Sequence, residues 1–316
     1  MTPPIVFMYS GQGAQYYHMG KQLFETDDTF RTWFRRCDEI VAPQIGASLE
    51  DLIYRERKDK YAPFERTLYT HPAIVAFSYS LTKCVTARGI QPDILLGYSL
   101  GECICAIIAG ATSLENGLTM IVNQAKALES DTEHAGMMAV LHHPDIMEHR
   151  PELFSGTWLA GHNFDGHFVV TGRRPALEKI EHALRNDGIT TQILPVTHGF
   201  HSPLVAPLEA HCKAVKNLAP FKMPVVSTLN KGRLQALTGD HIYNVLRNPV
   251  LFYDTVQALE AGNSYTYIDL GPAGTLSTFI KYALPPDSRS LALTCVNQFG
   301  RDRITMDKMF AAVGKA

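Results

Sequence analysis

The feature that most constrains this chain is the pentapeptide Gly-Tyr-Ser-Leu-Gly at 97–101. It fits the nucleophile-elbow pattern G-x-S-x-G. The apolar run 94–96 before it predicts a buried strand, and the apolar segment 103–111 after it predicts a core helix. A strand that turns this sharply into a helix would lift the hydroxyl of Ser99 into a cleft. The alternative is an ordinary helix start capped by Ser99, and the pentapeptide alone does not decide between them.

A serine hydroxyl is a weak nucleophile at neutral pH and needs an adjacent base. The chain has 13 histidines, and most lie in polar or helical surroundings that favour a surface role. The segment 197–203 is different, because it follows a predicted strand and forms a loop bounded by Gly199 and Pro203. Loops of this kind often carry catalytic groups. The residues themselves do not distinguish His198 from His201 as the base.

A serine that attacks an acyl carbonyl also needs hydrogen-bond donors for the tetrahedral oxyanion that forms. The backbone N–H of Leu100 is one candidate, because it follows the serine at the start of the predicted helix. The loop Gly11-Gln12-Gly13 is the second candidate. It ends the predicted first strand, 5–9, and its glycines free the backbone to point an N–H into a site. A plain tight turn is the alternative interpretation of this loop.

The length of 316 residues favours one large domain that carries a smaller inserted one. From about Gly136 the pattern changes to short strands around one clear helix, 175–186. This arrangement resembles a split β-α-β-β-α-β motif. We therefore expect an α/β protein with a second, smaller sheet.

Composition excludes several classes of partner. A formal net charge of -2 predicts no nucleic-acid partner and no binding to an anionic membrane. Six cysteines occur without a CxxC pair or metal-ligand spacing, so we expect reduced, buried thiols and no metal. No apolar run is long enough to cross a bilayer, and residues 1–8 lack the features of a secretory signal. These features predict a cytoplasmic protein.

Four motifs together carry a family resemblance. In chain order they are Ser10–Gln15, Gly97–Glu102, Phe200–Pro203 and Asp269–Pro272. Their types and order resemble the malonyl-CoA:acyl-carrier-protein transacylases and the acyltransferases of polyketide synthases. The resemblance covers nearly the whole chain. It implies an α/β-hydrolase-like catalytic domain from 1–126 and 195–316, with a ferredoxin-like subdomain at 127–194.

The resemblance also implies roles for individual residues. Ser99 and His201 would form a dyad, which selects His201 over His198. A backbone carbonyl within 248–251 would orient His201, and the backbones of Gln12 and Leu100 would donate to the oxyanion. The site would lie in the gorge between the two domains. The implied partner is an acyl carrier protein, whose phosphopantetheine, or CoA, carries the acyl group, and no resident cofactor is expected.

Two positions depart from the pattern of the malonyl-selecting members. Aligning 118–128 with the helix that carries their carboxylate-binding arginine places Gln124 at that position. A neutral amide leaves a buried carboxylate without a counter-charge, at a cost of about several kcal/mol. Lys126 does not replace the arginine, because residues two apart on a helix face different ways. Tyr98 stands where those members usually have histidine, and with Phe200 it is expected to shape the acyl cavity.

These departures resemble the freestanding homologues of trans-acyltransferase polyketide pathways that act as acyl hydrolases. Our leading hypothesis is therefore an enzyme that removes short uncharged acyl groups, such as acetyl, from carrier proteins. The alternative is a trans-acting acyltransferase that loads an acyl unit from CoA. A different class is a catalytically inactive subunit that only docks a carrier protein, but such a subunit would not need Ser99, His201 and Gln12 together. A generic α/β hydrolase would place an acid between Ser99 and His201 in chain order.

Overall fold

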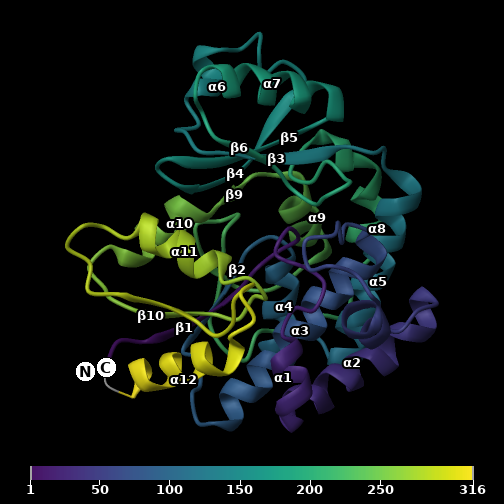
Figure 1. Ribbon diagram of the computed structural model, residues 1–316, viewed down its shortest axis with the longest axis vertical. Coiled ribbons are helices and arrows are strands. Elements are labelled where there is room, and N and C mark those ends of the chain that lie inside the picture. Colours follow the sequence, from purple (N-terminus) through teal and green to yellow (C-terminus); the bar gives the residue numbers. More distant parts are fainter. Residues whose placement is uncertain (1, 315–316) are drawn as a thin grey trace.

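The computed structural model describes residues 2–314, which form two β-sheets with helices packed around them (Figure 1). The larger sheet has the strand order β11-β10-β1-β2-β7-β8 and is parallel except for β8. Its strands are β1 (Ile5–Tyr9), β2 (Ile94–Gly97), β7 (Val225–Ser227), β8 (Gly232–Leu234), β10 (Thr266–Asp269) and β11 (Leu291–Thr294). The expected α/β fold class is confirmed.

The helices of the larger part surround this sheet. They are α1 (Lys21–Thr26), α2 (Asp28–Ile45), a π-helical turn (Asp51–Arg55), α3 (Thr67–Ala87), α4 (Leu100–Ile108), α5 (Leu114–Asp131), a 3-10 helix (Pro203–Leu208), α8 (Glu209–Lys213), α9 (Gly239–Arg247), α10 (Phe252–Glu260), α11 (Thr275–Ala283) and α12 (Asp302–Val313). Within residues 2–314, no helix is both long and apolar enough to span a bilayer.

The central strand β1 shows why both faces of the sheet are covered. Successive side chains of a strand point to opposite faces. Phe7 and Tyr9 pack into a core with helices α2 to α5, whereas Val6 and Met8 pack into a second core with α10 and α11. A strand buried on both faces has a continuous apolar sequence, as parallel sheets generally require.

The register of β1 and β2 brings the two candidate loops to one edge. The strands are parallel, and Tyr9 lies opposite Gly97. The loop that begins at Ser10 and the elbow that begins at Gly97 therefore leave the sheet side by side, at the carboxyl ends of the strands. Open α/β sheets usually bind ligands at this edge.

The smaller sheet has the order β6-β3-β5-β4-β9. Its strands are β3 (Gly136–Val140), β4 (Thr157–Phe164), β5 (His167–Gly172), β6 (Thr191–Ile193) and β9 (Val250–Leu251), and its helices are α6 (Ile146–His149) and α7 (Arg174–Asn186). β3 to β6 pair antiparallel in the expected split motif. Helix α6 is only four residues long, which is why the sequence indicates one clear helix in this region and not two.

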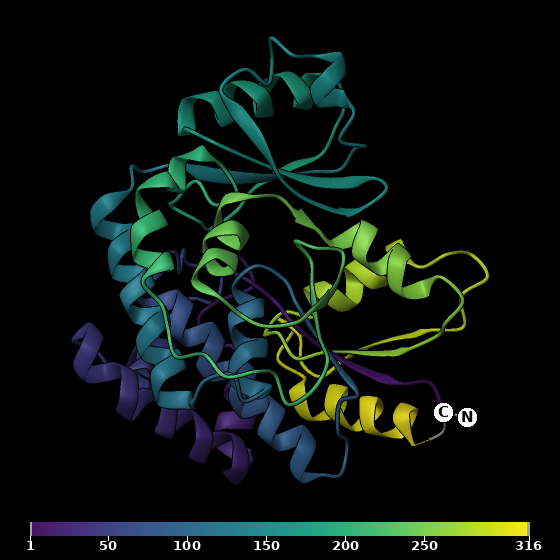
Figure 2. The same ribbon diagram turned by 180° about the vertical axis from the view of Figure 1, so that it is seen from behind.

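The two parts of the chain are joined through β9, which lies in sequence between α9 and α10. β9 pairs parallel with β4, so a strand from outside the segment 127–194 completes the smaller sheet. Figure 2 shows the light-green segment that contains β9 running along the lower side of the teal part of the molecule. Helix α5 also continues unbroken past 127 to Asp131. The division of the chain at 127 and 194 stays a prediction.

Candidate active site

The turn at Ser99 has the strained backbone of a nucleophile elbow. Its φ of 54° and ψ of -117° lie in a region that residues other than glycine rarely adopt. The glycines on either side make the turn possible. A Cβ on Gly101 would lie 1.9 Å from the carbonyl oxygen of Tyr9, and one on Gly97 would lie 2.5 Å from Cα of Glu102. The Ser99 side chain makes no capping hydrogen bond to α4, so the simple helix-cap interpretation does not describe it.

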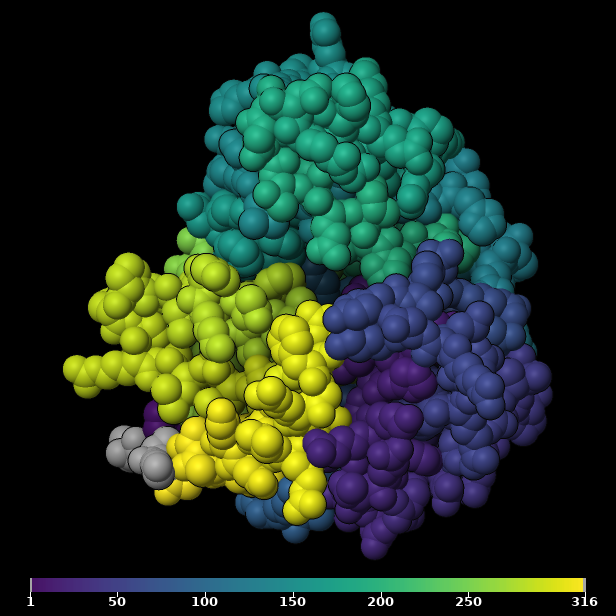
Figure 3. Space-filling model, viewed as in Figure 1, coloured from purple at the N-terminus to yellow at the C-terminus, as the bar shows by residue number. Residues whose placement is uncertain are grey.

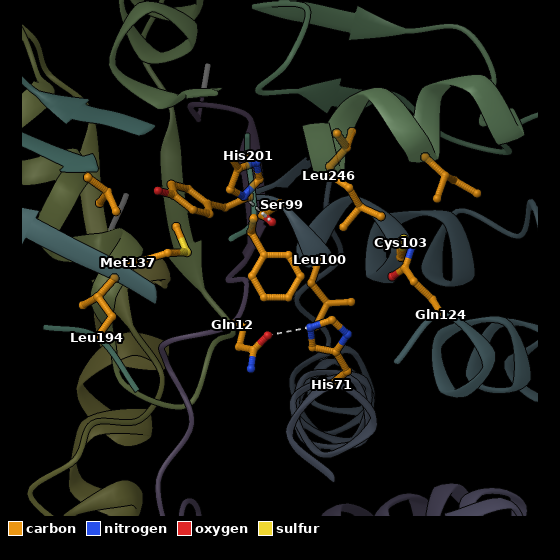
Figure 4. A pocket seen from close by; sticks show the side chains of 15 residues that line it. Gln12, His71, Ser99, Leu100, Cys103, Gln124, Met137, Leu194, His201 and Leu246 are labelled. Atoms are coloured by element: carbon orange, nitrogen blue, oxygen red, sulfur yellow. Dashed lines mark hydrogen bonds between the residues drawn. The ribbon is translucent and has the colours of Figure 1, made fainter. Parts of the chain in front are cut away.

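His201 lies against the serine. Its Nε2 is 2.9 Å from Oγ of Ser99 (Figure 4). Its Nδ1 donates to the backbone carbonyl of Asn248 at 2.8 Å. Because that carbonyl can only accept, Nδ1 carries the proton and Nε2 is free to accept one from Ser99. Burial lowers the pKa of His201 to about 4, and the bond to Asn248 partly opposes this effect. The imidazole is therefore neutral near pH 7.

His198 occupies a different environment. Its Nδ1 lies 2.9 Å from the hydroxyl of Thr132, and its ring stacks on His134. It is not among the residues that line the cavity at Ser99. The geometry thus distinguishes the two histidines that the loop pattern left open.

A buried acid and a third histidine support this arrangement, although sequence reasoning assigned neither a role. Glu102, on α4, accepts hydrogen bonds from Ser227 Oγ and from the backbone N–H of Thr228. Its other oxygen lies 2.6 Å from Nε2 of His241, in the first turn of α9. The last turn of the same helix supplies the Leu246 carbonyl that accepts from the His201 backbone N–H at 2.6 Å.

The loop that carries Gln12 packs against the elbow that carries Leu100, the two expected oxyanion donors. A Cβ on Gly11 would lie 2.9 Å from the carbonyl oxygen of Tyr98 and 3.5 Å from the backbone nitrogen of Leu100, so the 10–15 loop packs directly on the turn. Within residues 2–314, neither the Gln12 nor the Leu100 backbone N–H donates a hydrogen bond. Leu100 is the first residue of α4, where a helix leaves its N–H groups without an intrahelical partner, so both N–H groups are free to bond an oxyanion.

The cavity at Ser99 is small and mostly apolar, with a volume of about 60 Å³. Its lining comes from both sheets and their helices: Gln12, His71, Tyr98, Ser99, Leu100, Cys103, Gln124, Met137, Val169, Leu194, Phe200, His201, Ile242, Val245 and Leu246. No lysine, arginine, aspartate or glutamate is among these fifteen. Figure 3 shows the recess where the teal upper part meets the yellow and blue lower parts.

Burial raises the pKa of Cys103 to about 12, so this thiol does not compete with Ser99 as a nucleophile.

The expected selector, Gln124, lies in the cavity wall. It is buried on α5, and its amide nitrogen is 4.0 Å from Sγ of Cys212. Lys126 is exposed, as expected from its place on the helix. Helix α5 is fixed at its start by Ser113, whose hydroxyl accepts from the backbone N–H of Asn116.

Tyr98 and Phe200 also line the cavity. The Tyr98 hydroxyl donates to Oδ1 of Asn163 on β4 at 2.9 Å, so this side chain reaches from the elbow to the smaller sheet. Burial raises the pKa of Tyr98. The Phe200 ring lies between His71 and His201, with centroid distances of 5.7 and 6.5 Å. His71, on α3, is a further cavity residue that sequence reasoning missed, because nothing in its local pattern separates it from a core histidine.

Comparison with known proteins agrees with this geometry. The acyl transferase domain family matches residues 6–309. The polyketide biosynthesis acyltransferase homolog PksD of Bacillus subtilis is 37% identical over 305 residues, which cover 96% of this chain and 94% of that protein. The homolog BaeD of Bacillus velezensis is 34% identical, covering 98% and 96%. The acyltransferase domain from the second module of the salinomycin polyketide synthase superposes with a TM-score of 0.84 at 26% identity, covering 98% of this chain and 73% of that one.

Proposed function

This chain belongs to the acyl transferase domain family, and from that premise we propose that it is an acyl hydrolase of polyketide biosynthesis. Its substrates are short, uncharged acyl groups, such as acetyl, held as thioesters on an acyl carrier protein. The observation that carries this proposal is the cavity lining at Ser99, in which Gln124 contributes an amide and no side chain contributes a cation.

In the first half-reaction, Ser99 Oγ attacks the thioester carbonyl while His201 Nε2 accepts the hydroxyl proton. A C–O bond forms, and the carbonyl oxygen becomes an oxyanion held by the N–H groups of Gln12 and Leu100. Collapse of this intermediate breaks the C–S bond. His201 returns its proton to the departing phosphopantetheine sulfur, which leaves an acyl ester on Ser99.

The second half-reaction repeats this chemistry with water. His201 takes a proton from the water as its oxygen attacks the ester carbonyl, and the same two N–H groups hold the oxyanion. The C–O bond to Ser99 then breaks, and His201 protonates the serine oxygen. The products are the free acid and the regenerated enzyme.

The cavity favours a neutral acyl group, because its lining offers no cation to a carboxylate. A malonyl carboxylate would lose its hydration without gaining a cation, at a cost of about several kcal/mol. The neutral amide of Gln124 does not offset this cost.

The alternative is an acyltransferase that passes the acyl group to a thiol. It uses the same dyad, and the names of the relatives PksD and BaeD favour it. Incubating acetyl-carrier protein alone with the enzyme separates the two functions. Release of free acetate without CoA or a second carrier supports hydrolysis. A stable acetyl-Ser99 ester that only a thiol discharges would replace the hydrolase assignment with the transferase.

A further inference from the structure

The side chain of Gln12 is held at both ends by consecutive residues of α3. Its amide nitrogen donates to the hydroxyl of Thr70 at 3.1 Å, and its amide oxygen lies 2.7 Å from Nε2 of His71. Thr70 and His71 are both buried. Figure 4 shows the Gln12–His71 contact at the floor of the cavity, below Ser99.

The identity of the acceptor fixes the form of the histidine. An amide oxygen can only accept, so Nε2 of His71 carries the proton and donates. Burial lowers the pKa of His71 to about 3, and the nearby His198 adds to the shift. His71 is therefore a neutral donor across the working pH range. Its Nδ1 is buried and has no hydrogen-bond partner within residues 2–314.

The rest of the loop has separate anchors. The Gly13 N–H donates to the side-chain oxygen of Gln15 at 2.7 Å, and the Gln15 amide nitrogen donates to the carbonyls of Phe64 and Pro195. These bonds hold the loop beyond Gln12. The Gln12 side chain itself makes hydrogen bonds only to Thr70 and His71 within residues 2–314.

We propose that His71 is a positioning residue that fixes Gln12 so that its backbone N–H points at the carbonyl oxygen of the substrate. The inference rests on the proposed function, in which Gln12 donates to the oxyanion. His71 does not itself touch the reacting atoms. It acts by preventing the loop at 12 from rotating when charge develops, and preorganised donors stabilise an oxyanion because they need no rearrangement.

The test compares His71→Leu and His71→Gln with the parent enzyme. The leucine variant loses the donor, whereas glutamine keeps an N–H at similar reach. We expect His71→Leu to lower kcat for acetyl-carrier protein by about 10- to 100-fold with KM within about threefold, less than the 10²- to 10³-fold loss of a whole oxyanion donor. His71→Gln is expected to recover most of that loss.

A transition-state readout separates positioning from general damage. A trifluoromethyl ketone analogue of acetyl-pantetheine adds to Ser99 and forms an oxyanion next to the Gln12 and Leu100 N–H groups. Its affinity for His71→Leu should therefore fall in parallel with kcat.

Thr70→Val removes the other hydrogen bond to the Gln12 side chain with little change of shape. It should also lower kcat and the affinity for the analogue. This variant also keeps the test decisive if His71→Leu does not fold. Ser80→Ala is the control, because in the described part of the chain this buried α3 hydroxyl bonds only to the Ala76 carbonyl of its own helix.

A folded His71→Leu enzyme with kcat and analogue affinity within twofold of the parent would overturn the positioning role, as would unchanged values for Thr70→Val. Neither result would contradict the proposed hydrolase function. A parent enzyme that forms no acyl ester on Ser99 would overturn the proposed function, and this inference with it.

Discussion

Nε2 of His241 lies 2.6 Å from Oε2 of Glu102, and both side chains are buried. This contact joins the helix that follows the nucleophile to the helix whose last turn holds His201. Ser227 and Thr228 bond the other carboxylate oxygen, Oε1, so replacing His241 leaves the Glu102 carboxylate only partly satisfied.

We expect His241→Leu to lower the free energy of unfolding by about 1.5–3 kcal/mol. The buried Glu102 carboxylate then loses the hydrogen bond that it accepts from His241. The value of kcat should also fall, since α9 then holds the Leu246 and Asn248 carbonyls less firmly. Urea denaturation and steady-state kinetics measure the two effects. His149→Leu is the control, because the His149 side chain on α6 is exposed, and it should change stability by less than about 0.5 kcal/mol. Equal stabilities of the two variants would contradict the role given to this contact.

Replacing Ser99 with alanine should reduce turnover by at least about 10⁴-fold, because no covalent intermediate forms. Intact-mass spectrometry after mixing with acetyl-carrier protein should show a 1:1 acetyl adduct in the parent and none in the variant. Carrier binding, measured by calorimetry, should be largely unchanged. An adduct that persists in Ser99→Ala would assign the nucleophile to another residue.

His201→Ala should slow both formation and hydrolysis of the ester by about 10²- to 10⁴-fold, because one base serves both steps. Rapid-quench measurement of the adduct resolves the two rates. His198→Ala is the matched control, since His198 lies outside the cavity lining. Turnover at the parent rate in His201→Ala would require a different base.

The pH dependence follows from the lowered pKa of His201. The base is active when neutral, so kcat/KM should fall as the pH drops through the pKa of the free enzyme. That pKa is about 4, so activity should persist well below the ordinary histidine value of about 6.5. A kcat/KM profile on a short acyl-pantetheine thioester tests this. A midpoint between pH 6 and 7 would mean that water reaches His201 in the working enzyme.

Gln124→Arg should shift the preference from acetyl towards malonyl. A bidentate, charge-assisted pair with a carboxylate is worth about 1.5–3 kcal/mol, which corresponds to roughly tenfold or more in relative kcat/KM. Acetyl turnover should fall, because the guanidinium is then buried without a partner. Lys126→Arg is the control, since its side chain is exposed on another face of α5. Equal acetylation and malonylation of parent Ser99 would show that Gln124 is not the selector.

Local pattern was sufficient to predict the parts of this protein that depend on neighbours in sequence. The elbow needs a strand, two glycines and a helix within about fifteen residues, and the sequence shows all three. The split motif of the smaller sheet was likewise visible in the spacing of its strands. Helix α6 was missed because four residues are too few to establish a helical period.

The contacts that were missed join distant segments. Glu102 and His241 are 139 residues apart, and Gln12 and His71 are 59 apart. Hydrogen bonding between buried side chains leaves no periodic signal, so each histidine resembles an ordinary core or surface residue in sequence. The resemblance to a family identified His201 through a motif, whereas His71 and His241 lie outside the four motifs.

The pairing of β9 with β4 bears on chimaeric enzymes. An exchange of 127–194 with a relative would place a foreign β4 beside Val250 and Leu251, the residues with which the native β4 pairs. The same short strand follows Asn248, whose carbonyl holds the base. A graft that ignores this strand would therefore disturb catalysis through a residue that the graft never replaces, and a transferable cassette has to include 248–251 as well as 127–194.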